Sequence, residues 1–119
     1  MKKLIINKKY ELKEVVDIIS TLIKDSGYTN ENYSLYVKKG EMKYAPTLIC
    51  FVGLCPTISD SDEEIYPEYV SDNNFEVFYD GNQFEDVISN VLHQKGEVLV
   101  QDTIRALEYY SKKDTFLDL

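Results

Sequence analysis

The chain has 119 residues, of which 44% are hydrophobic and 29% charged, and this balance predicts one folded domain and excludes a disordered chain. Its 21 acidic and 13 basic residues give a formal net charge of -8, and its single arginine argues against a direct nucleic-acid binder. The apolar runs are too short for a membrane span or a secretory signal, and two cysteines make no disulfide framework, so we expect a cytoplasmic protein with reduced thiols.

The first half of the chain predicts one helix and two strands. Apolar residues spaced three and four apart over residues 11–26, followed by Gly27, indicate an amphipathic helix and its end. Residues 33–38 alternate as a strand does. The continuous apolar run of residues 47–54 has the length of a strand and predicts a central strand covered on both faces.

The middle of the chain begins with an acidic segment, residues 57–64, which we expect to be a loop. A short helical turn is predicted at residues 67–71, because proline is tolerated at the first helical position and Pro67 stands there. The aromatic and β-branched residues 75–79 then predict another strand.

Two further helices are predicted before the C-terminus. Asn82 is the expected N-cap of the first, Glu85 completes a capping box with it, and Gly96 ends the helix. An apolar stripe predicts the last helix over residues 99–113. The elements together predict a single small α+β domain, residues 1–119, with about three helices packed on a small, mainly antiparallel sheet of about three strands.

The sequence carries no catalytic or metal-binding signature. Residues 60–64 resemble the start of a calcium loop, but Ile65 and Ser71 occupy the positions that require glycine and glutamate. A nucleophile and base would need His93 beside a cysteine, and nothing in the sequence brings them together. We therefore expect a protein that is not an enzyme and uses no cofactor.

Charge is divided unevenly along the chain. Residues 1–59 hold nine lysines and six acids, a net charge of +3, whereas residues 60–119 hold three lysines, Arg105 and fifteen acids, a net charge of -11. Ten of these acids fall within residues 60–86, interleaved with six aromatic residues. An acidic surface attracts a basic partner and speeds its encounter, and aromatic residues are enriched at interface cores. The alternative is that the acids form only a solvated face.

Four short stretches carry a resemblance to a known family. They are Tyr33-Ser-Leu-Tyr36 with the strand that follows, the acidic loop before Pro67, Asp72-Asn73-Asn74 leading into a strand, and Ile104-x-x-Leu107 with Tyr109-Tyr110 and Asp114-x-Phe116. Together they span residues 33–117, and they resemble a family of small bacterial domains that includes immunity partners of polymorphic toxins, such as those of contact-dependent growth inhibition systems. The resemblance implies an immunity function and supplies no catalytic residues.

Charge and resemblance together predict an immunity protein. We expect it to bind a cognate toxin, a nuclease domain, one to one and to cover the toxin's basic active-site or substrate-binding surface with an acidic face. The residues expected to steer the partner by their charge are Asp60, Asp62, Glu63 and Glu64. The expected aromatic anchors are Tyr66 and Tyr69, and the acids expected at the rim of the interface are Glu68 and Asp72. The tyrosines could instead pack in the core. The alternative function is a non-catalytic acidic binding or regulatory module for another basic protein.

Overall fold

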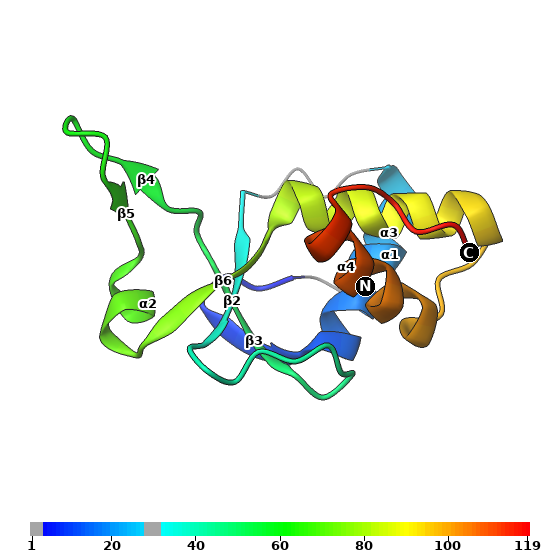
Figure 1. Cartoon of the computed structure of the whole chain (residues 1–119), viewed down its shortest axis with the longest axis horizontal. Helices are drawn as coiled ribbons and strands as arrows, with labels where there is room; N and C mark the ends of the chain where they lie inside the picture. The colour runs from blue at the N-terminus through cyan, green and yellow to red at the C-terminus, as the bar shows by residue number, and fades with distance from the viewer. Residues whose placement is uncertain (1–3, 28–31) are drawn as a thin grey trace.

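A four-stranded antiparallel sheet forms the centre of the fold (Figure 1). The structure is a computed structural model that describes residues 4–27 and 32–119. The strands lie in the order β1–β3–β2–β6, and their bounds are Lys8–Glu11, Ile49–Gly53, Ser34–Lys38 and Phe75–Asp80 in that order. β3 pairs with β1 on one side and β2 on the other, so part of the apolar run forms a central strand. The expected cover on both faces is incomplete, because Ile49 is 49% exposed.

Three helices pack together and cover one face of the sheet (Figure 1). They are α1 (Leu12–Ser26), α3 (Gly81–Lys95) and α4 (Val100–Lys113). Their apolar stripes meet the alternate strand residues that point to the same side, which include Leu35, Val37, Cys50 and Val52. The predicted single α+β domain with an antiparallel sheet is confirmed, and each of the three long helices begins or ends within about two residues of its predicted limits.

The opposite face of the sheet is covered only in part. Tyr36, Phe51 and Phe75 point to this side and pack with Val70 of α2 (Glu68–Asp72) as a second, smaller apolar cluster. The chain that leads to α2 forms a hairpin of β4 (Thr57–Ile58) and β5 (Glu64–Ile65), which projects away from the body of the molecule (Figure 1). The helices and this projection therefore lie on opposite sides of the sheet.

The strand predictions were incomplete. Residues 57–64, expected to be a loop, contain β4 and the beginning of β5. β1 was also missed, because Lys8-Lys9-Tyr10-Glu11 contains only one apolar residue and its pairing with β3 was not visible in the sequence. Edge strands and isolated hairpins carry polar residues because water or a partner meets them, so hydrophobic patterning detects them poorly.

The predicted N-cap of α3 was wrong by two residues. Asp80 occupies the N-cap, and its carboxylate accepts hydrogen bonds from the backbone N–H groups of Asn82 at 2.8 Å and Gln83 at 3.4 Å. Glu85 does not close a capping box; its carboxylate accepts a hydrogen bond from the buried Tyr33 hydroxyl at 2.8 Å. The strand therefore runs directly into the helix, with no intervening turn. Among the described residues, no helix is long and apolar enough to cross a membrane.

Candidate partner-binding surface

The eight residues predicted to bind a partner lie on one projecting segment, residues 57–72, here named the acidic arm. All eight side chains are exposed, and none forms an ion pair with another described residue within 4 Å. The arm comprises the β4–β5 hairpin and α2, joined by Tyr66 and Pro67. A cluster of unpaired carboxylates on a projection produces a negative field that reaches beyond the molecule's own surface.

The tip of the hairpin is built by a serine-rich turn. The backbone N–H of Asp62 donates to the Ser59 carbonyl at 3.0 Å, and that of Ser59 donates to the Glu63 carbonyl at 2.9 Å. Asp62 has φ 63°, a left-handed conformation that aspartate tolerates better than most residues. This is the three-residue hairpin loop in which a turn is followed by a left-handed residue. It holds Asp60 and Asp62 at the outermost part of the arm.

Strand register distributes the hairpin side chains over two faces. Thr57 pairs with Ile65, and Ile58 pairs with Glu64, so each pair shares a face. Tyr66 lies two residues after Glu64, and its hydroxyl donates a hydrogen bond to the Glu64 carboxylate, which raises the pKa of Tyr66. The Glu64 carboxylate and the Tyr66 ring of the arm therefore lie side by side.

α2 anchors the arm to the sheet. Val70 is buried against Tyr36, Phe51 and Phe75, and the ring of Tyr69 stacks on Phe51 with ring centroids 4.5 Å apart. One face of Tyr69 therefore packs on the core cluster while the other part of the ring stays exposed. The alternative of core packing is thus half correct for Tyr69. Tyr66 has no ring contact among the described residues, and it lies at the surface.

Exposed aliphatic residues on and beside the arm were missed by the sequence reading. Ile58 is 64% exposed and Ile65 is 52% exposed, one on each face of the hairpin, and Leu54 at the base of the arm is 54% exposed. A two-stranded hairpin is marginally stable alone in water, and it gains stability when a partner covers it. The signal was present as Ile58 and Ile65 flanking the acids, but strand pairing was needed to recognise it.

A cavity of about 400 Å³ lies at the base of the arm. Its apolar lining is formed by Phe51, Leu54, Pro67 and Tyr69, and Glu68 lies at the same cavity. Aromatic rings and a carboxylate around one apolar cavity suit a basic side chain with an apolar stem, such as arginine. Of the predicted residues, only Glu68 and Tyr69 meet here. Tyr66 lines a separate cavity of about 300 Å³ with Val70.

Two acids of the dense block serve the fold rather than the arm. Asp80 caps α3, and Glu85 is buried beside Tyr33. The acidic stretch therefore combines the exposed acids of the arm with two carboxylates, those of Asp80 and Glu85, that have structural contacts.

The cysteines and the histidine occupy separate environments. Cys50 is buried in the main core, where burial raises the pKa of its thiol to about 12, so the thiol is protonated at neutral pH. Cys55 lies beyond β3 and accepts a hydrogen bond from the Ser34 hydroxyl at 3.3 Å. His93 is exposed in the last turn of α3. Within residues 4–27 and 32–119, no three His, Cys, Asp or Glu residues are grouped to hold a metal ion.

Comparison with known proteins defines the family of the chain. Neither curated proteins nor solved structures gave a match. The family described as "Domain of unknown function (DUF7716)" matches residues 10–119, which include all the strands and helices apart from the first two residues of β1. The chain therefore belongs to the DUF7716 family.

Proposed function

We propose that this chain is a non-catalytic immunity protein that acts in the cytoplasm and neutralises a bacterial toxin by binding it. The observation that carries the proposal is the acidic arm: a projecting hairpin whose carboxylates have no ion-pair partner among the described residues, beside exposed Ile58, Ile65 and Leu54. Exposed carboxylates together with exposed aliphatic and aromatic side chains on one projecting segment support a protein-binding surface.

The partner is proposed to be a nuclease domain with a basic substrate-binding surface. Such a surface binds the phosphates of a nucleic acid, and the exposed carboxylates of the arm would occupy it with the same sign of charge. Asp60, Asp62, Glu63 and Glu64 would act mainly on the rate of association, because exposed rim charges steer an approaching partner. Tyr69 and the cavity at the base of the arm would supply the buried contacts that slow dissociation.

The first experiment is co-expression of this chain with the toxin-like open reading frame beside its gene. Rescue of growth together with co-purification at moderate salt supports the proposal. Toxicity that this chain leaves unchanged, or the absence of a toxic neighbouring gene, contradicts it. Co-purification of a basic protein without rescue would instead favour the general binding or regulatory module.

A charge-reversal pair of variants then locates the interface. The variant D62K/E63K/E64K is expected to slow association with the toxin about tenfold or more at low salt, because it converts an attractive field into a repulsive one. The matched control D86K/E97K/D118K changes the net charge equally at exposed positions away from the arm. If the two variants slow association to the same extent, net charge alone acts and the arm is not the binding surface.

A further inference from the structure

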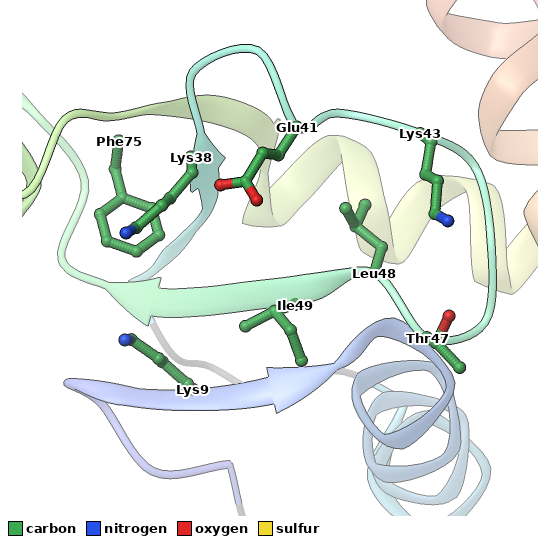
Figure 2. Close-up of a pocket in the computed structure, with 8 residues that line it drawn as sticks. All are labelled: Lys9, Lys38, Glu41, Lys43, Thr47, Leu48, Ile49 and Phe75. Atoms are coloured by element: carbon green, nitrogen blue, oxygen red, sulfur yellow. The ribbon is translucent and has the colours of Figure 1, made fainter.

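Another cavity, of about 380 Å³, opens on the sheet face opposite the three long helices (Figure 2). Lys9, Lys38, Ile49 and Phe75 come from four different strands but point to the same face of the sheet. Glu41, Lys43, Thr47 and Leu48 from the β2–β3 connection complete the lining. The cavity is therefore assembled by the fold from positions that are far apart in the sequence.

The lining is basic although the protein as a whole is acidic. It contains three lysines and one carboxylate, that of Glu41, in a chain whose net charge is -8. None of the three lysines forms an ion pair within 4 Å with any described carboxylate. The Lys9 ammonium instead lies 5.9 Å from the centroid of the Phe75 ring. Like charges around one cavity repel one another, and a bound anion would relieve that repulsion.

The basic side chains in this cavity are lysines, which favour a phosphate over a carboxylate as the bound anion. Lysine ammonium groups are compact point charges that suit phosphate oxygens, whereas planar carboxylates are bound best by the fork of arginine. The Lys9 and Lys38 ammonium groups lie at the Phe75 end of the cavity and that of Lys43 lies at the Thr47 end, so these charges suit an extended anion better than a small one (Figure 2). Between them, Ile49 is 49% exposed and offers an apolar surface on the floor of the cavity (Figure 2). A ligand with a chain of phosphates and a flat apolar group would satisfy both parts.

We propose that this cavity binds a nucleoside polyphosphate, with its phosphates at the end formed by Lys9 and Lys38 and its base over Ile49, on the side of Lys43. The lining contains none of the eight arm residues, although Lys9 and Phe75 both lie beside the Tyr69 ring, with the Lys9 ammonium 6.0 Å from its centroid.

The test is calorimetric titration of the full chain with ATP, adenosine and inorganic tripolyphosphate at low salt. Saturable one-to-one binding of ATP that is tighter than that of either other compound is expected. Single Lys9→Gln and Lys38→Gln substitutions should each weaken ATP binding about twofold to fivefold, as exposed charge contacts do. Lys43→Gln should weaken it less, and the triple variant should abolish it. Glu41→Gln should tighten binding, because it removes a repelling carboxylate from the cavity.

Two controls make the result decisive. The variant K24Q/K95Q/K113Q removes three exposed lysines elsewhere and should bind ATP as the unmodified chain does. Ile49→Ala should weaken ATP but leave tripolyphosphate unchanged. Absence of saturable ATP binding, or equal losses in the two triple variants, overturns the site. Tripolyphosphate binding as tight as that of ATP overturns the place of the base on Ile49.

Discussion

Tyr33 and Glu85 form a buried polar contact between the start of β2 and the first turns of α3. The Tyr33 hydroxyl donates to a Glu85 carboxylate oxygen at 2.8 Å, and both residues are almost fully buried. Burial and, next, the adjacent carboxylate raise the pKa of Tyr33, so the phenol remains a proton donor at physiological pH. Gly81 lies against the same residue: a Cβ there would be 2.5 Å from the Tyr33 carbonyl oxygen. The glycine is therefore required by close packing.

Removing the Tyr33 hydroxyl should measurably destabilise the protein. Tyr33→Phe leaves a buried carboxylate without one of its donors, and the expected loss in the free energy of unfolding is about 1–3 kcal/mol. Urea unfolding followed by circular dichroism measures it. Tyr109→Phe, at a half-buried position on α4, is the matched control and should change stability by a few tenths of a kcal/mol at most. Equal losses in the two variants would contradict a specific role for the Tyr33 hydroxyl.

At the scale of elements, the N-cap of α3 can be tested by mutation, because the structure and the sequence pattern assign it to different residues. The structure places the Asp80 carboxylate on the N–H groups of Asn82 and Gln83, whereas the sequence pattern pointed to Asn82. Asp80→Ala should therefore lower the free energy of unfolding by about 0.5–2 kcal/mol, and Asn82→Ala should have little effect. Thermal unfolding of the two variants measures this difference. A larger loss for Asn82→Ala would restore the sequence-based assignment.

The long helices could be predicted because their apolar spacing and terminal glycines are local signals. Gly27 and Gly96 end α1 and α3 with positive φ, as their positions suggested. The misplaced cap of α3 has a tertiary cause. Gly81 forms the first residue of α3 where its lack of a side chain lets the helix approach Tyr33. An Asp-Gly pair often forms a turn, but here Asp80 caps the helix and Gly81 makes the close contact with Tyr33.

In the candidate site too, features that depend on local sequence could be predicted, whereas features formed by tertiary packing could not. The exposure of the six arm acids could be predicted from their charge, whereas the sequence left open whether Tyr66 and Tyr69 face solvent or pack in the core. The cavity at the base of the arm could not be predicted, because it joins Asn7, Leu54 and Tyr69 through the pairing of β1 with β3 and the packing of α2. The lysine-lined cavity is likewise a product of sheet register, and the sequence showed only an excess of lysines in the first half.

For the whole molecule, buried tyrosine hydroxyls connect the layers. The Tyr33 hydroxyl bonds to Glu85 of α3, that of Tyr79 donates to the Leu107 carbonyl of α4 at 2.6 Å, and that of Tyr36 donates to the Leu54 carbonyl at the base of the arm at 2.6 Å. In each case burial is the main cause of a raised pKa, which for Tyr36 reaches about 12. The contacts of the sheet with α3, with α4 and with the base of the arm therefore all depend on tyrosine hydroxyls that stay protonated.

This dependence predicts a loss of stability in alkali. A tyrosine in the unfolded chain ionises at about pH 10, whereas these buried tyrosines keep their protons to higher pH in the folded chain. Their contribution to the free energy of unfolding is therefore complete below about pH 10 and falls as the pH rises above it. The buried Cys50 thiol, with its pKa raised to about 12, adds to the same fall. The unfolding midpoint in urea should therefore decrease steadily between about pH 9 and about pH 12, and Tyr36→Phe should flatten part of that decrease. Tyrosinate absorbance recorded alongside circular dichroism tests the mechanism: exposed tyrosines should ionise while the chain is folded, and the buried ones only as it unfolds. Ionisation of every tyrosine in a chain that stays folded would show that these phenols do not hold the layers together.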